Sequence, residues 1–112
     1  MPVKISLSDA VSHNRNGVVA RYYQLPDVEN GKTVAYAEFS GEHGERTIGE
    51  HVRIYYVLEG QGEFLVNGVK YPVDRGDLVT IPPHATYNLW PQGRTIKVLL
   101  YMELLDIAQL PK

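Results

Sequence analysis

The chain contains no cysteine, which excludes disulfide bonds, thiol catalysis and cysteine-ligated zinc sites. It has no apolar run near the ~18 residues of a membrane-spanning helix, and its first residues, MPVKISLSDAV, lack the apolar core of a signal peptide. Neither sign of charge dominates, because 11 basic and 13 acidic side chains give a net charge of −2. We therefore expect a soluble cytoplasmic protein with no nucleic-acid partner and no membrane partner.

Helical periodicity is nearly absent as well. The best helical candidate, Ser6–Val11, is too short to be stable by itself. From Gly17 onward, short segments of strand-forming residues alternate with turn signals, at a spacing typical of an all-β sandwich or barrel. With 112 residues, 44% of them hydrophobic, we expect one domain with one core over residues 1–112.

Turn signals divide this pattern into strands. Asn67-Gly68 is the strongest hairpin signal, because a type I′ turn requires a positive φ at both central residues. Pro82-Pro83 must end a strand, because neither proline can donate to a ladder. The glycine-rich segment 41–49 is predicted to be an exposed loop, and residues 104–112 a C-terminal tail. The predicted strands are Val18–Tyr23, Thr33–Phe39, His51–Leu58, Gly62–Val66, Val69–Val73, Asp77–Ile81, Thr86–Trp90 and Ile96–Met102.

Two phrases within this pattern resemble the motifs of the cupin family. Val57-Leu58-Glu59-Gly60 is similar to the end of the first family motif, and Gly76-Asp77-Leu78-Val79-Thr80-Ile81-Pro82-Pro83 is similar to the second. The resemblance covers residues from about 44 to 90 and implies an all-β, cupin-type jelly-roll β-barrel. It does not imply one activity, because this fold hosts isomerases, epimerases, dioxygenases, storage proteins and sensor domains.

The metal-binding positions of that family carry other residue types in this chain. The family uses an H-x-H pair and a Glu in its first motif and a His in its second. Those positions fall near Thr47, Gly49, Arg53 and Tyr87. None of the four is a good ligand for a divalent ion, and the guanidinium of Arg53 would repel one. The resemblance therefore implies a cupin without the usual metal ligands, for which we expect no cofactor.

Alternation along the strand predicted at His51–Leu58 indicates which side chains face the barrel interior. Successive side chains point to opposite faces, so His51, Arg53 and Tyr55 share one face. If Arg53 points inward, as the family's Glu does, the other two do as well, and Tyr87 faces them. Arginine binds oxyanions through paired hydrogen bonds, and tyrosine stacks and donates. We therefore expect a small polar or anionic metabolite, foremost a sugar or sugar phosphate, to be bound by Arg53, Tyr55, Tyr87 and His51.

The same residues allow other roles. Arg53 could pair inside the protein with Glu50, Glu103 or another carboxylate, because a buried guanidinium needs a partner. His51 and Tyr87 could be the general base and acid of a sugar isomerase or epimerase, since an imidazole titrates near neutral pH. The sequence does not decide between a binding protein and an enzyme.

Two further alternatives stay open. His51 and His84, with His43 or Glu50, could form a rearranged metal site, although no close histidine spacing enforces it. The chain could also be a dimeric structural or regulatory module without a working site.

The strand predicted at Ile96–Met102 is apolar on both faces, which favours a central strand or a subunit interface. The resemblance points the same way, because small cupins usually dimerise by pairing their sheets. Interface or core positions are also expected for Trp90, Tyr22, Tyr23 and Tyr56. We therefore expect a homodimer.

Overall fold

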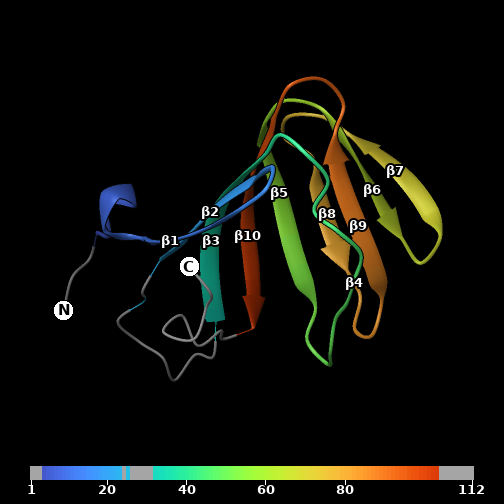
Figure 1. The fold of residues 1–112 in the computed structure, drawn as a ribbon. Helices are drawn as coiled ribbons and strands as arrows, with labels where there is room; N and C mark the ends of the chain where they lie inside the picture. The colour runs from blue at the N-terminus through green and yellow to red at the C-terminus, as the bar shows by residue number, and fades with distance from the viewer. Residues whose placement is uncertain (1–3, 24, 26–31, 104–112) are drawn as a thin grey trace.

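The computed structural model describes residues 4–23, 25 and 32–103, which Figure 1 shows as two layers of strands. Within these residues the secondary structure is one turn of 3-10 helix, η1 (Leu7–Asp9), and ten strands. No helix in this part of the chain is long and apolar enough to cross a membrane. The strands are β1 (Val11–Arg15), β2 (Val18–Tyr23), β3 (Lys32–Phe39), β4 (Arg46–Thr47), β5 (Arg53–Glu59), β6 (Gly62–Val66), β7 (Val69–Val73), β8 (Leu78–Ile81), β9 (Thr86–Pro91) and β10 (Ile96–Glu103).

Antiparallel pairing joins these strands into two sheets. The first has six strands in the order β1-β2-β3-β10-β5-β8, and the second has four in the order β4-β9-β6-β7. The last strand, β10, lies between β3 and β5, and β9 lies between β4 and β6, so each sheet combines strands that are far apart in the chain. The prediction of an all-β jelly-roll fold is confirmed.

The predicted strands are all present, and β2, β6 and β7 have the predicted bounds. Asn67 and Gly68 connect β6 to β7 with φ angles of 49° and 82°, as a type I′ turn requires. The helical candidate Ser6–Val11 is wrong apart from the short η1, because Val11 already begins β1. Residues 104–112, predicted to be a tail, lie outside the described residues.

Two strands were not predicted. The first is β1, which pairs with β2 in a hairpin. The second is β4, a two-residue strand that pairs with β9 inside the segment predicted to be an exposed loop. Both strands carry mostly polar residues, so their hydrophobic pattern is weak.

The strand β10 lies at the centre of the six-stranded sheet, as its apolar sequence predicts. Ile96 and Val98 are fully buried between the sheets, whereas Leu99 and Tyr101 on the opposite face are 36% and 39% exposed. Complete burial of such an aliphatic side chain contributes roughly 1.5–3 kcal/mol. The other fully buried aliphatic and phenylalanine side chains of the core are Val57, Phe64, Ile81 and Leu89.

The motif glycine Gly60 stands where the chain leaving β5 passes close to the start of β10. Its φ is +87°, and a Cβ at this position would lie 2.3 Å from the carbonyl oxygen of Thr95. Any other residue would need both a strained backbone and a displacement of its neighbour. This glycine is therefore a packing requirement of the fold and says nothing about the ligand.

Space remains between the sheets where β2 and β3 run side by side, because their inward side chains are small. Ala20 of β2 is in register with Ala37 of β3, and Tyr22 is in register with Ala35. All three alanines are buried. Methyl groups cannot reach across to the second sheet, and the hollow that results is the site described next.

Candidate functional site

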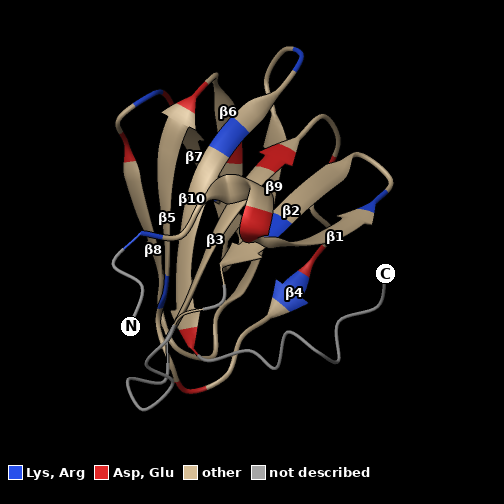
Figure 2. Cartoon of the chain, turned by 90° about the vertical axis from the view of Figure 1, so that its left-hand side faces the viewer, with Lys and Arg blue, Asp and Glu red and all other residues tan. Residues whose placement is uncertain are grey.

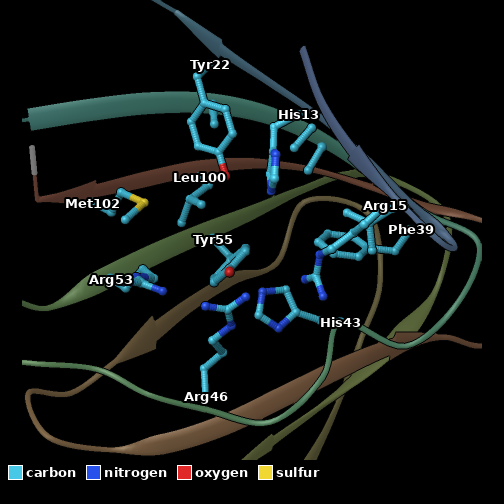
Figure 3. A pocket seen from close by; sticks show the side chains of 14 residues that line it. His13, Arg15, Tyr22, Phe39, His43, Arg46, Arg53, Tyr55, Leu100 and Met102 are labelled. Carbon is cyan, nitrogen blue, oxygen red and sulfur yellow. The ribbon is translucent and has the colours of Figure 1, made fainter. Parts of the chain in front are cut away.

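A cavity of about 180 Å³ lies against the inner face of the six-stranded sheet (Figure 3). A ligand in it would meet apolar surface on one side and hydrogen-bond donors on the other. The apolar wall comes from β2, β3 and β10 and consists of Val18, Ala20, Ala35, Ala37, Phe39, Leu100 and Met102. The polar wall consists of His13, Arg15, Tyr22, His43, Arg46, Arg53 and Tyr55.

The unpredicted strand β1 supplies two of the polar side chains. His13 is in register with Ala20, and Arg15 with Val18. Side chains that are in register on neighbouring strands share a face of the sheet. Because Ala20 and Val18 point inward, His13 and Arg15 line the cavity as well. The turn before β2 contains Gly17, whose φ is 77°.

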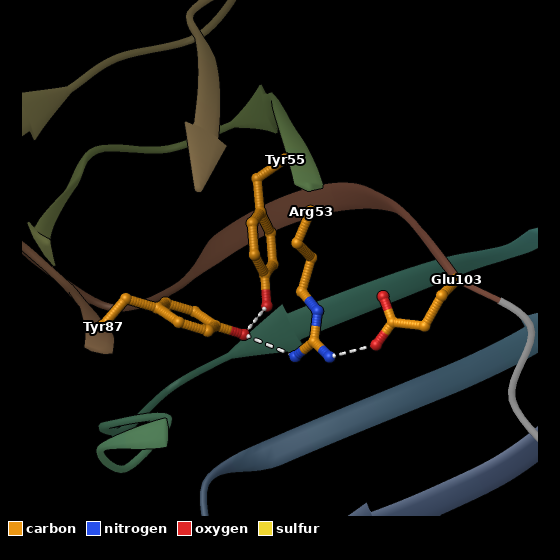
Figure 4. Close-up of polar contacts among 4 residues, drawn as sticks. All are labelled: Arg53, Tyr55, Tyr87 and Glu103. Atoms are coloured by element: carbon orange, nitrogen blue, oxygen red, sulfur yellow. Dashed lines mark hydrogen bonds and ion pairs between the residues drawn. The ribbon is translucent and has the colours of Figure 1, made fainter. Parts of the chain in front are cut away.

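A hydrogen-bonded network forms the wall around Arg53 (Figure 4). Its Nη1 donates to the hydroxyl of Tyr87 at 3.2 Å, and its Nη2 donates to Oε1 of Glu103 at 2.9 Å. The hydroxyls of Tyr55 and Tyr87 are 2.6 Å apart. These residues come from β5, β9 and β10, so the network ties the two sheets together beneath the cavity.

Burial governs the protonation of this network. Burial disfavours the charged form of Arg53, but the oxygens of Tyr87 and Glu103 outweigh that effect and raise its pKa. Burial and the neighbouring Tyr87 raise the pKa of Tyr55 well above its usual value, so this phenol keeps its proton. Arg53 is therefore a permanent cation, held by the carboxylate of Glu103 and the hydroxyl of Tyr87.

The ion pair between Arg53 and Glu103 confirms one of the internal partners considered for this arginine. Only one of its two possible hydrogen bonds is made, since Nε of Arg53 and Oε2 of Glu103 are buried without a partner. The pair is therefore not a closed bidentate contact. Arg53 also lines the cavity, so internal pairing and ligand contact are compatible.

The other two guanidinium groups of the cavity have no such carboxylate. Among the described residues, neither Arg15 nor Arg46 takes part in an ion pair. Both lie close enough, with Arg53, to lower the pKa of His43. Figure 3 shows the three guanidinium groups directed toward a common space. Within the described residues, the cavity thus carries positive charge that no carboxylate pairs with, which attracts an anion.

His43 projects into this space from the segment between β3 and β4. Its ring packs between Phe39 and Tyr87, with centroids 5.7 and 5.3 Å away. Its Nδ1 lies 2.7 Å from the carbonyl oxygen of Gly44, so Nδ1 carries the proton and donates it. Burial is the main cause that lowers the pKa of His43 to about 4, and the three guanidinium groups add to it. The imidazole is therefore neutral at physiological pH, with Nε2 as an acceptor.

The backbone around His43 is fastened to β9. The His43 amide donates to the carbonyl of Leu89 at 2.8 Å. The Gly44 amide donates to Oδ1 of Asn88 at 2.8 Å, and Nδ2 of Asn88 donates to Glu42 at 2.7 Å. Asn88 is 8% exposed, so these bonds are largely shielded from water. A segment with little regular structure thereby holds its imidazole in one position.

The predicted ligand-binding residues separate into two groups. Arg53, Tyr55 and Tyr87 come together in one network, as the alternation predicts. His51 does not join them, because β5 begins only at Arg53 and His51 is exposed in the preceding bend. The expectation that His51 points inward is therefore wrong. His84 is also exposed, in the turn after β8 with a φ of 66°.

The residues at the site do not fit a divalent metal. Arg53 and Tyr87, which the motif resemblance places at the family's Glu and second-motif His positions, form a hydrogen bond with each other. Three guanidinium groups surround the space that a cation would have to enter. Across residues 4–23, 25 and 32–103, no three His, Asp or Glu side chains gather as metal ligands, so His51, His84, His43 and Glu50 form no cluster.

The sequence did not indicate three of the seven residues of the polar wall, His13, Arg15 and Arg46, and it gave His43 and Tyr22 other roles. His13 and Arg15 were missed because β1 was not predicted, although Asn16-Gly17 is a hairpin signal of the same kind as Asn67-Gly68. Arg46 was missed, and His43 was considered only as a metal ligand, because their segment reads as an exposed loop.

The depressed pKa of His43 predicts a pH dependence of stability. An unfolded histidine takes up a proton near pH 6.5, whereas the folded His43 does so only near pH 4. Between these values the unfolded state binds more protons, so the free energy of unfolding falls as the pH is lowered. The decrease in the free energy of unfolding builds up as the pH falls from 6.5 to 4, and it reaches roughly 3 kcal/mol at most.

Urea unfolding between pH 4 and pH 8 measures this effect. The variant His43→Gln should lose this part of the pH dependence, and His84→Gln, which alters an exposed imidazole, should keep it. Identical pH profiles for wild type and His43→Gln would contradict the description of His43.

Comparison with known proteins gives a relative in sequence and solved structures of similar fold. The uncharacterized protein MJ1618 of Methanocaldococcus jannaschii is 29% identical over 90 residues, which make up 76% of this chain and 72% of that protein. Pac13, a nucleoside dehydratase from Streptomyces, is similar with a TM-score of 0.80 at 20% identity over 100% of both chains. Pac13 variants that replace a histidine by glutamine or a tyrosine by phenylalanine have been solved with uridine.

A predicted oxalate decarboxylase from Thermotoga maritima is also similar, with a TM-score of 0.74 at 22% identity over 92% of this chain and 100% of that chain. At these identities the solved structures establish the shared fold alone. The family model for the cupin domain, Cupin_2, matches residues 39–102, which is more than half of the chain. The protein belongs to the cupin family.

Proposed function

We propose that this protein is a metal-independent cupin that binds a small anionic metabolite, foremost a sugar phosphate or sugar acid, in the cavity between its sheets. One observation carries the proposal. Three guanidinium groups line a single cavity, and among the described residues only Arg53 has a carboxylate partner. Positive charge that no carboxylate of the described residues pairs with attracts an anion to the cavity.

The polar wall offers different kinds of contact to such a ligand. Arg53 is fixed by Tyr87 and Glu103, so it provides a donor whose position does not depend on the ligand. Arg15 and Arg46 are exposed at the edge of the cavity and can close on a phosphate or carboxylate through paired hydrogen bonds. The hydroxyls of Tyr22 and Tyr55 can form hydrogen bonds with the hydroxyl groups of a sugar.

The size of the cavity limits what is enclosed. A volume of about 180 Å³ holds several water molecules. That accommodates an anionic group and a few further atoms, and a larger ligand would extend through the opening beside Arg15 and Arg46. Pac13, a cupin-fold enzyme that acts on a nucleoside, supports a ligand with a sugar ring.

The donor set supports the proposed independence from metal. Charged guanidinium groups and protonated phenols are poor ligands for divalent cations. They are good ligands for oxyanions, which are the ligands we propose. The cavity also favours the binding proposal over a structural module without a working site, because such a module has no reason to keep a hollow lined by arginines.

Substitution of the unpaired arginines tests the proposal. Arg15→Gln and Arg46→Gln should each weaken the binding of inorganic phosphate about tenfold or more, since each removes charge-assisted hydrogen bonds of ~1.5–3 kcal/mol. Phosphate titrations followed by amide chemical shifts in NMR spectra measure the affinity.

Arg94→Gln is the matched control, because Arg94 is exposed in the turn between β9 and β10 and does not line the cavity. It should bind phosphate like the wild type. The proposal fails if the wild type does not bind phosphate or ribose 5-phosphate, or if the cavity variants bind as tightly as Arg94→Gln.

We further propose that the protein is a homodimer that pairs the outer faces of its six-stranded sheets. Tyr36, Leu99, Tyr56 and Leu78 form one continuous row across β3, β10, β5 and β8. Tyr56 and Leu78 are 41% and 60% exposed. Figure 2 shows that charged residues concentrate at strand ends and turns, leaving long uncharged stretches on these strands. A second copy presents the same apolar row, as a two-fold interface requires.

A charge placed in the middle of this row should prevent the pairing. Leu99→Asp should halve the molar mass measured by light scattering, because a buried carboxylate without a partner is costly. Val69→Asp is the control, since Val69 is 51% exposed on the other sheet and should leave the dimer intact. A monomeric wild type, or a dimeric Leu99→Asp protein, would refute the proposed interface.

A further inference from the structure

The cavity contains a histidine whose proton-accepting nitrogen is defined by the structure. The Nδ1 of His43 donates to the Gly44 carbonyl at 2.7 Å, which leaves the lone pair on Nε2. Among the described residues, Nε2 has no hydrogen-bond partner. The ring packs against Phe39 and Tyr87, and its backbone is fastened to β9. A neutral imidazole held in one tautomer at a ligand cavity is the arrangement of a general base.

The positive charges around His43 would stabilise the negative charge that forms in a reaction with an anionic intermediate. The groups that face it are the guanidinium groups of Arg15, Arg46 and Arg53 and the phenol of Tyr87. These cations oppose protonation of the imidazole when the cavity holds no anion. A bound phosphate or carboxylate balances part of their charge, so a substrate would make Nε2 more basic at the moment it arrives. The same cations stabilise negative charge that develops on a substrate oxygen.

We propose that His43 is a general base that takes a proton from the carbon beside the carbonyl group of an anionic sugar bound in the cavity. This inference rests on the proposed anion site. The C–H bond breaks, the proton goes to Nε2, and the electron pair of that bond moves toward the carbonyl oxygen to form an enolate. The imidazolium then returns a proton to the former carbonyl carbon, while the hydroxyl proton of the first carbon passes to the enolate oxygen. The step needs no oxidant and no reductant, and its outcome is an isomerisation.

The assignment replaces His51, which the sequence suggested as the base of such a reaction. His51 is exposed outside the cavity, whereas His43 lines it. Tyr87 stays beside the base, with its ring centroid 5.3 Å from that of His43. His13 also lines the cavity, and we choose His43 because its hydrogen bond to the Gly44 carbonyl defines which ring nitrogen accepts a proton.

Proton exchange with solvent tests the chemistry directly. The protein is incubated in deuterated water with dihydroxyacetone phosphate and with ribulose 5-phosphate, and the loss of the proton signals beside the carbonyl is followed by NMR. General-base catalysis contributes ~10²–10⁴-fold. The wild type should therefore exchange at least one of these probes about a hundredfold or more faster than His43→Gln. The variant His84→Gln changes an exposed imidazole and should exchange like the wild type.

Binding is measured on the same samples, so that a failure of the anion site can be distinguished from a failure of the general base. If neither phosphate ester nor inorganic phosphate binds the wild type, the anion site is wrong and this inference falls with it. If they bind but the wild type exchanges no faster than His43→Gln, the anion site stands and the general base is refuted.

The titration of His43 itself gives a second test that does not depend on a variant or on the choice of probe sugar. Its ring signals are followed against pH in NMR spectra, with and without saturating inorganic phosphate. Phosphate should move the titration midpoint upward, because it balances the charge of the guanidinium groups. A midpoint that phosphate does not move would overturn the proposal that a bound anion activates His43.

Discussion

A buried guanidinium is the feature on which the rest of this structure depends. Arg53 lies on β5 with its side chain 14% exposed, and a charge so placed is tolerated only when acceptors surround it. Glu103 on β10 supplies the charged acceptor, and Tyr87 on β9 supplies a neutral one. Loss of any member would leave a buried polar group without a partner, which costs about 1–3 kcal/mol or more. The network therefore holds a positive charge at a defined position in the wall of the cavity.

Two further arginines beside this network, Arg15 and Arg46, give the cavity an excess of positive charge. Glu103 balances one of the three guanidinium groups, and the others have no ion pair within the described chain. By their resemblance to the cupin motifs, Arg53 and Tyr87 stand where the family has a metal-ligating Glu and His, and we propose that the site binds an anion in place of a cation. A neutral histidine beside such a site completes the groups that acid–base chemistry on an anionic sugar needs.

Much of the fold and part of the site could be predicted from the sequence. The turn at Asn67-Gly68 and the motif phrase ending at Gly60 depend on local backbone geometry, so they are readable from residue types alone. Arg53, Tyr55 and Tyr87 were predictable because each lies on a strand next to a recognised phrase. His51 was assigned inward only because the strand was extended past its true start at Arg53.

The rest of the site depends on contacts between segments far apart in the chain. Arg46 and His43 sit in a segment with few apolar residues, held by hydrogen bonds to Asn88 and Leu89 that no local pattern reveals. Arg15 and His13 face inward because β1 pairs with β2, and the polar sequence of β1 hides that pairing.

The most direct test of the account is calorimetric titration of chelator-treated protein with ribose 5-phosphate and, separately, with ribose. We expect the phosphate ester to bind without added metal, more tightly than ribose and less tightly at high salt, because the guanidinium groups recognise its charge. Elemental analysis of the same sample verifies that metal is absent. Binding that appears only when a divalent metal is restored, or equal affinity for ribose and its phosphate, would contradict the account.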